Sequence, residues 1–257
     1  MLSEYETKKL KPIEIIEEEA IDLEDKIVIQ GFPGMGLVGT IAAHHLVTSL
    51  NLKQVGYLVG IEMPPIVVVH QSKPMSPVRI YSNEDFALVV SEIAIPNYTV
   101  YPLVKTLLEW YKEKNVKEVV VIGGLGNPDR LTLEELEVFG VSTNEDTRKF
   151  LESHDVKILD EGVLVGPLAV TLRESVVSNI PAYGLLSQCF SKFPDPDAAA
   201  RVLQVLESLV GIKVDLNTLF EKAEELKIRM RDLAKRTDQE AKMAEQEAAT
   251  APKSYYS

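Results

Sequence analysis

Short runs of branched apolar residues alternate along the chain with longer segments in which apolar residues recur every three or four positions. The short runs, bounded by glycine or proline, are typical of buried strands, and the longer segments are typical of helices that pack by one face. Strands are expected at residues 26–30, 55–59, 66–69, 86–90, 118–122, 156–159 and 182–186. Helices are expected at residues 37–50, 100–114, 145–153, 168–177 and 198–210. This alternation predicts an α/β fold whose sheet is buried on both faces.

Four prolines in the first half of the chain modify this picture. Pro64, Pro65, Pro74 and Pro77 stand between strand candidates. Proline donates no hydrogen bond to a strand ladder, so it is confined to edges, bulges and loops. We therefore expect an antiparallel or edge portion here. The predicted fold class is α/β, with a mixed, mostly parallel sheet flanked by helices and a helical C-terminal extension.

The C-terminal part has a different pattern from the α/β units. Asp195 and Pro196 form a helix start, and Gly211 is a natural helix end. A second helix is expected from about Asp215, because apolar residues follow at heptad spacing: Leu216, Leu219, Ala223, Leu226, Met230 and Leu233. This stripe packs either on the chain's own sheet or against another subunit, and the sequence leaves both alternatives open.

These patterns divide the chain into four segments. We expect an acidic N-terminal segment at residues 1–25, an α/β core domain at 26–212, a C-terminal helix at 213–247 and a flexible tail at 248–257. We interpret the carboxylates of the first segment as a solvated surface rather than a metal site or a site for a basic partner. They are Glu14, Glu17, Glu18, Glu19, Asp22, Glu24 and Asp25.

Charge and cysteine content exclude several classes of function. The 257 residues include 27 lysines and arginines against 39 aspartates and glutamates, a formal net charge of −12. Sequence-independent binding to nucleic acid or to an anionic membrane needs clustered cations, so neither partner is expected. The single cysteine, Cys189, excludes an internal disulfide and favours a reducing compartment. With no apolar run long enough to span a membrane, a soluble, cytoplasmic protein is expected.

One glycine loop has the spacing of a cofactor site. Gly34, Gly36 and Gly39 spell G-x-G-x-x-G between a strand and a helix, and Glu62 follows where a ribose-binding carboxylate belongs. A nucleotide- or small-ligand-binding enzyme is therefore one hypothesis. A tight turn that packs strand against helix is the other, and we favour it, because a proline-rich stretch interrupts the next βαβ unit. A Walker A loop is excluded, since no lysine precedes Thr40.

Other catalytic and metal-binding patterns are missing from the sequence. His44 and His45 are adjacent, so on a helix they point about 100° apart and are poorly placed to ligate one metal ion. Ser175, Ser187 and Ser191 lie in no G-x-S-x-G context. We expect no metal, no cofactor and no catalytic residue.

Four motifs in order give the chain a family resemblance. They are G-F-P-G-M-G-L-V-G-T at 31–40, I-G-G-L-G-N at 122–127, I-P-A-Y-G-L-L at 180–186 and P-D-P-D-A-A-A at 194–200. Over residues 13–235 the chain resembles the proteasome assembly chaperone 2 family. The resemblance implies a fold related to nucleoside phosphorylases without their catalytic residues. It also implies an archaeal proteasome assembly chaperone homologue that forms a homo-oligomer, which we expect to be a tetramer or pentamer.

The resemblance also gives the last three residues a role. Some members of this family end in a hydrophobic–Tyr–any tripeptide that docks on the α-ring of the proteasome core particle, and Tyr255, Tyr256 and Ser257 fit that pattern. The first position is aromatic here rather than the commoner aliphatic residue. A terminal carboxylate can pair with a lysine, and a tyrosine buries a large ring at low conformational cost. We therefore expect these residues to bind the α-subunits.

Overall fold

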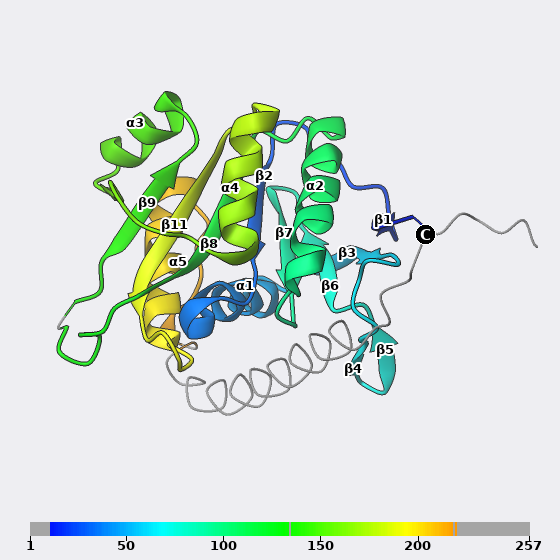
Figure 1. Cartoon of the computed structure of the whole chain (residues 1–257), viewed down its shortest axis with the longest axis horizontal. Coiled ribbons are helices and arrows are strands. Elements are labelled where there is room, and N and C mark those ends of the chain that lie inside the picture. Colours follow the sequence, from blue (N-terminus) through cyan, green and yellow to red (C-terminus); the bar gives the residue numbers. More distant parts are fainter. Residues whose placement is uncertain (1–10, 134, 218, 220–257) are drawn as a thin grey trace, which may run out of the picture.

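The computed structural model describes residues 11–133, 135–217 and 219, and its centre is a nine-stranded sheet (Figure 1). The strands run in the order β1-β3-β6-β7-β2-β8-β11-β9-β10. Their bounds are β1 Glu14–Glu17, β2 Ile27–Gly31, β3 Lys53–Val59, β6 Val78–Ser82, β7 Phe86–Ser91, β8 Glu118–Gly126, β9 Val138–Ser142, β10 Lys157–Ile158 and β11 Ala182–Cys189. Two further strands, β4 Val68–His70 and β5 Lys73–Met75, pair only with each other as a hairpin.

Pairing changes from parallel to antiparallel across the sheet. The four central strands β7, β2, β8 and β11 run parallel, whereas β1, β3 and β6 form an antiparallel side next to β7. At the other side β9 is antiparallel to β11 and parallel to β10. The predicted mixed sheet is confirmed. Parallel pairs do not outnumber antiparallel ones, because the proline-rich half adds antiparallel strands where crossover helices would otherwise follow.

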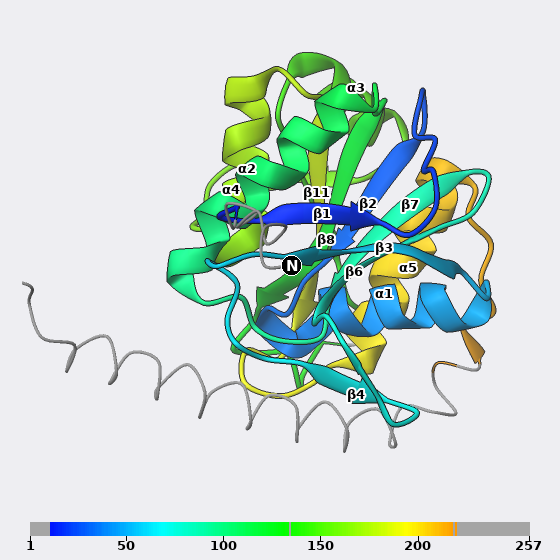
Figure 2. The same cartoon turned by 90° about the vertical axis from the view of Figure 1, so that its right-hand side faces the viewer.

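Helices cover both faces of the sheet. Their bounds are α1 Val38–Ser49, α2 Asn97–Glu113, α3 Glu145–Ser153, α4 Gly166–Ser178 and α5 Pro196–Val210. Apolar side chains of α1, α3 and α5 form one buried cluster with the sheet, and α2 and α4 belong to a second cluster on the opposite face (Figures 1 and 2). Buried strands such as β7, with all six residues inside, separate the two clusters.

Four strands, β1, β5, β6 and β9, lie outside the predicted strand ranges, and β5 and β6 belong to the proline-rich stretch in which an antiparallel portion was expected. Strand β1 lies within the acidic run and pairs with β3 at the sheet edge seen in Figure 2. Ile13, Ile21 and Leu23 are buried around it, and the Glu17 carboxylate accepts hydrogen bonds from Trp110 and Lys114, so this segment packs on the body and is only in part the solvated surface that was expected. Strand β9 has the sequence V-F-G-V-S, in which a glycine interrupts the apolar run, and its partner β11 is more than forty positions away, so no local pattern marked it.

The predicted ends of α5 are confirmed. The Asp195 carboxylate accepts a hydrogen bond from the Ala198 amide at 3.2 Å, and Gly211 ends the helix with a φ of 73°. Beyond this helix, Leu219 is buried in the cluster of α1 and α5. Leu216 is partly buried and packs against the same cluster, whereas Ala223, Leu226, Met230 and Leu233 lie outside the described residues.

Candidate functional site

The G-x-G-x-x-G loop connects β2 to α1 across the carboxyl ends of the parallel strands, where α/β proteins usually bind ligands. Residues Met35–Leu37 form a single 3-10 turn, within which Gly36 has a φ of 61°. A Cβ added at Gly39 would lie 2.5 Å from the Ile122 carbonyl oxygen, and one at Gly124 would lie 2.3 Å from the Met35 carbonyl oxygen. Within the motif the packing hypothesis is confirmed at Gly39, where backbone packs on backbone, and at Gly36, whose φ is positive, but not at Gly34, where nothing lies within 4 Å of an added Cβ.

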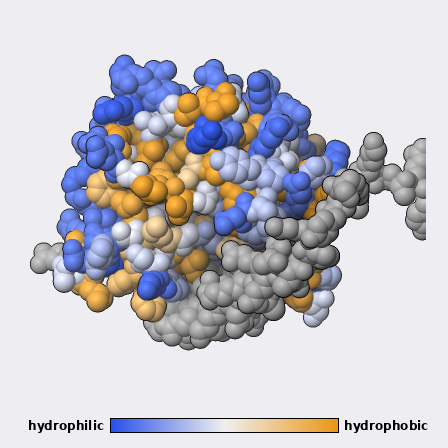
Figure 3. Space-filling view, in the orientation of Figure 1, coloured by the Kyte–Doolittle hydropathy of each residue, from blue (hydrophilic) through white to orange (hydrophobic). Residues whose placement is uncertain are grey.

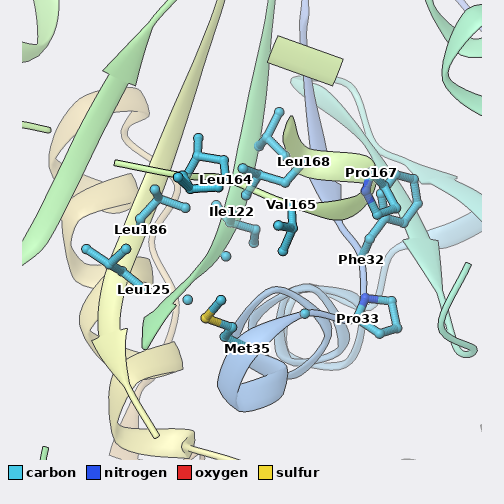
Figure 4. A pocket seen from close by; sticks show the side chains of 15 residues that line it. Phe32, Pro33, Met35, Ile122, Leu125, Leu164, Val165, Pro167, Leu168 and Leu186 are labelled. Atoms are coloured by element: carbon cyan, nitrogen blue, oxygen red, sulfur yellow. The ribbon is translucent and has the colours of Figure 1, made fainter. Parts of the chain in front are cut away.

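Beside this loop is a small apolar cavity of about 60 Å³ (Figure 4). Its lining comes from the loop, β8, β11 and the segment before α4: Phe32, Pro33, Gly34, Met35, Val121, Ile122, Gly123, Gly124, Leu125, Val163, Leu164, Val165, Pro167, Leu168 and Leu186. This lining holds no charged or hydroxyl side chain. Sites for drug-sized ligands are typically about 300–1,000 Å³ and carry a few converging polar groups. The cavity therefore does not favour a nucleotide.

A largely buried ion pair connects the glycine loop between β2 and α1 to the start of α5. Arg130 donates two hydrogen bonds to the Asp195 carboxylate, at 2.7 Å and 3.0 Å, and only 1% of Asp195 is exposed. The Asp195 amide donates to the Gly36 carbonyl oxygen at 2.8 Å. This clamp ties the start of α5 to the glycine loop and to the segment after β8. Sequence reasoning found the helix cap but missed Arg130, whose partner is 65 positions away.

The lone cysteine lies beneath the same loop. Cys189 is buried, and burial together with the Asp195 carboxylate raises the pKa of its thiol to about 12. At neutral pH this group is a thiol rather than a thiolate, and the thiolate is the nucleophilic form. The arrangement is that of a packed structural cysteine.

The other predicted ligand groups do not converge on the cavity. Glu62 is not among the lining residues, and its backbone instead bonds to Pro12 and to the Thr99 hydroxyl. His45 is buried in α1, with its Nε2 atom 3.1 Å from the Asp215 carbonyl oxygen. Within the described ranges no group of three or more histidine, cysteine or acidic side chains is placed to hold a metal ion.

A buried polar chain joins the two helices of the other face to the sheet. Thr171 of α4 donates to the Gln30 side-chain oxygen at 2.9 Å, and Gln30 donates to the Tyr111 hydroxyl of α2 at 2.8 Å. Burial raises the pKa of Tyr111 well above its ordinary value. Each member is satisfied by another member, so the chain positions α2 and α4 without presenting a group to a ligand.

The predicted proteasome-binding residues Tyr255, Tyr256 and Ser257 lie outside the described residues, as does the rest of segment 220–257. Of the helices the structure does describe, none is both long and apolar enough to cross a membrane. The described part thus contains the small apolar cavity beside the glycine loop. The predicted proteasome-binding tail is supported by the sequence alone.

Comparison with known proteins decides the family. The model of the PAC2 family matches residues 28–234. The chain belongs to the PAC2 family. It is 31% identical over 222 residues to the uncharacterized protein MJ0106 of Methanocaldococcus jannaschii, covering 86% of this chain and 91% of that one. The resemblance drawn from the four motifs is confirmed.

Solved structures show the same architecture. The crystal structure of Pyrococcus furiosus PbaA, described as an archaeal homolog of proteasome-assembly chaperone, matches with a TM-score of 0.82 at 30% identity, over 89% of this chain and 99% of PbaA. Pyrococcus furiosus PbaB, described as an archaeal proteasome activator, matches with a TM-score of 0.74 at 24% identity, over 88% of this chain and 100% of PbaB. At that identity the second match supports the fold alone.

Proposed function

We propose that this chain is a non-enzymatic, proteasome-associated protein of the cytoplasm, either an assembly chaperone homologue or an ATP-independent activator. The observation that carries the proposal is the similarity to PbaA, which extends over nearly the whole of both chains. Membership of the PAC2 family over residues 28–234 supports it. The partner is the set of α-subunits of the proteasome core particle.

The closed crevice supports a binding role over catalysis. Backbone contacts at Gly39 and Gly124 occupy the place where an α/β enzyme would hold its ligand, and the remaining cavity is apolar. The thiol of Cys189 is buried and protonated. These observations give no support to the alternative of a nucleotide-binding enzyme.

The anchor in this proposal is the tripeptide Tyr255-Tyr256-Ser257, joined to the body through residues 248–254. Its terminal carboxylate pairs with a lysine between two α-subunits, and the penultimate tyrosine ring fills the adjoining pocket. One tripeptide has few anchoring groups and loses entropy on ordering, so a single copy binds weakly. A homo-oligomer, a tetramer or pentamer, carries several tails and gains avidity of about 10²–10⁴-fold.

The experiment is a pulldown of core particle with intact protein and with protein lacking residues 255–257. We expect the intact chain to retain the core particle and the deletion to lose it. A Tyr98→Ala variant is the matched control, because Tyr98 is an exposed tyrosine on the body, 56% accessible, and its removal leaves the tail intact. Equal retention by the intact and tail-deleted proteins would contradict the proposed anchor.

A peptidase assay on the retained complex separates the two proposed roles. Faster hydrolysis of a small peptide substrate indicates an activator, whereas binding only to unassembled α-subunits indicates an assembly chaperone. Calorimetric titration with nicotinamide and adenine nucleotides tests the enzyme alternative, and we expect no binding. A micromolar dissociation constant that Gly36→Val abolishes would overturn the non-enzymatic reading.

A further inference from the structure

A cleft opens at the amino edge of the sheet, on the side opposite the glycine loop. It lies where β2, β8 and β11 begin, between the start of α3 and the end of α5, toward the top of the view in Figure 1. Its volume is about 640 Å³, within the range of about 300–1,000 Å³ that is typical of small-molecule sites. None of its lining residues belongs to the small cavity beside the glycine loop. The cleft is therefore a separate candidate site.

Tyr183 of β11 brings a buried hydroxyl to this cleft. The residue is 0% exposed, and its hydroxyl has no hydrogen-bond partner in the part of the chain that the structure describes. Its ring packs on the ring of Phe150, with 5.9 Å between the centroids, and Phe150 lines the cleft. The phenol therefore lies beneath the cleft. Because an unpaired buried hydroxyl is unfavourable, this position favours a ligand atom that can pair with it.

Glu118 of β8 places a carboxylate next to this hydroxyl. Tyr183 stands opposite Val120, and Glu118 is two residues before Val120, so both side chains lie on the same face of the sheet. Burial raises the pKa of Glu118, and only the charge of Lys117 acts against this, because no hydrogen bond to the carboxylate contributes. The Glu118 charge in turn helps burial to raise the pKa of Tyr183 well above its ordinary value. The half-buried carboxylate therefore lacks a donor of its own.

The surroundings of these two groups favour a cation. The lining holds four carboxylates against two lysines: Asp25, Asp85, Glu118 and Asp146, with Lys26 and Lys117. The last two residues of α5 also line the cleft, and the last turn of this helix contains no basic residue to balance its negative end. The positive end of α3 is already satisfied by the Asn144 cap and two acidic residues, and the α3 corner is hydrophilic at the upper left of Figure 3.

We propose that this cleft binds the primary ammonium group of a small aliphatic amine. An ammonium group has three N–H donors and no acceptor, whereas the Glu118 carboxylate and the Tyr183 hydroxyl oxygen are two acceptors without donors. One ammonium can donate to both, and its bond to the carboxylate is charge-assisted. The apolar side chains of Phe150 and Leu209 in the lining suit the methylene groups of the amine. This site goes beyond the proposed function and does not depend on the tail.

The test is calorimetric titration of the full-length protein with the diamine cadaverine. We expect a dissociation constant below about 1 mM, and no binding of pentanediol, a neutral molecule of the same length. A second arm uses N-acetyl-lysine methylamide, which carries the same ammonium on a lysine side chain. Comparable binding of both amines extends the site to lysine residues of proteins, and binding of cadaverine alone assigns it to free amines. Both results support an ammonium site.

Two conservative variants test the assigned acceptors. Glu118→Gln removes the charge at nearly constant shape and is expected to weaken cadaverine binding at least about tenfold. Tyr183→Phe removes only the hydroxyl, and we expect a loss of about fivefold. Glu62→Gln is the matched control, because Glu62 is also half-buried but follows the carboxyl end of β3, outside the cleft. We expect this control to bind cadaverine like the intact protein.

Circular dichroism of each variant shows whether it is folded, and Tyr183→Phe decides the outcome if Glu118→Gln does not fold. Three results would each overturn the proposal. They are no binding of cadaverine, equal binding of pentanediol, and unchanged affinity for cadaverine in the folded variants of Glu118 and Tyr183.

Discussion

The parallel centre of the sheet and its antiparallel side are stabilised by different interactions. At the parallel centre, β2, β8 and the glycine loop approach so closely that a Cβ added at Gly39 or Gly124 would lie within 2.5 Å of a carbonyl oxygen. On the antiparallel side, charged side chains connect the elements: Glu17 joins β1 to α2, and Glu92 joins the hairpin to β6. Gly39 and Gly124 therefore have no room for a side chain, and the cavity of about 60 Å³ beside the loop is small and apolar. The antiparallel side instead carries the projecting β4–β5 hairpin, where Val67 and Val69 are each 63% exposed.

The largest expected effect is at the parallel centre. Gly39→Ala places a methyl group against backbone oxygen atoms that have no room to move, and it should lower the free energy of unfolding by about 3 kcal/mol. Gly34→Ala is the matched control from the same motif, since nothing lies within 4 Å of its added Cβ and its φ of −158° suits alanine. Urea unfolding measures both. Equal stabilities of the two variants would remove the contrast between the centre and the edge.

The second-largest effect on stability is expected at the Arg130–Asp195 pair beside the glycine loop. Asp195→Ala removes the cap of α5 and leaves Arg130, whose side chain is 11% exposed, with only its longer contact to the Asp197 carboxylate at 3.4 Å. We expect a loss of about 2–3 kcal/mol in the free energy of unfolding, because a largely buried guanidinium loses its nearest carboxylate and α5 loses its cap. Asp195→Asn keeps a capping oxygen and should lose less. If both variants unfold like the intact protein, the loop is not held by this pair.

The antiparallel side should respond to acid. Burial raises the pKa of Glu17, but hydrogen bonds from the Trp110 indole and the Lys114 ammonium outweigh it, and the net pKa is below the ordinary value. A carboxylate with a lowered folded-state pKa stabilises the fold at neutral pH, and this contribution is lost as pH falls through that pKa. Glu17→Gln should therefore be less stable than the intact protein at pH 7, with the difference disappearing in acid. Exposed Glu24→Gln is the control, and a pH-independent difference for Glu17→Gln would contradict the charge argument.

The smallest effect on stability is expected at the exposed valines of the β4–β5 hairpin region. Val67 and Val69 are mostly exposed within one chain, so Val67→Asp/Val69→Asp should change the unfolding free energy of the dissociated subunit by no more than about 0.5 kcal/mol. Thermal unfolding at low protein concentration measures this. A loss comparable to that of Gly39→Ala would show that these valines support the fold of the single chain.

Sequence reasoning was most successful where a local signal existed. The helix starting at Asp195 and ending at Gly211, and the strand at 118–122, follow from capping and apolar runs. Strand β1 was not predicted, because its glutamates conceal the alternation and its pairing with β3 is forty positions away. The Arg130–Asp195 clamp and the carbonyl contacts of Gly39 depend on tertiary approach, which no local pattern encodes.

The candidate site also contains features that the sequence identifies and features that only the structure explains. The motif at Gly34, Gly36 and Gly39 was recognisable, but only the structure distinguishes a packed loop from a phosphate cradle. The tail differs from the glycine motif, because Tyr255, Tyr256 and Ser257 are identified from the sequence alone, by their order and their position at the chain end. The central claim, that the tail binds the proteasome core particle, is therefore tested at the tail.

The most direct measurement is surface plasmon resonance of the full-length protein on immobilised proteasome core particle, compared with Tyr256→Ala. We expect the intact oligomer to dissociate slowly from the core particle. We expect Tyr256→Ala to lose affinity by at least about 100-fold, because each tail loses its buried ring and the weakening multiplies over several tails. Identical binding curves for the two proteins, or no binding of the intact chain, would contradict the account.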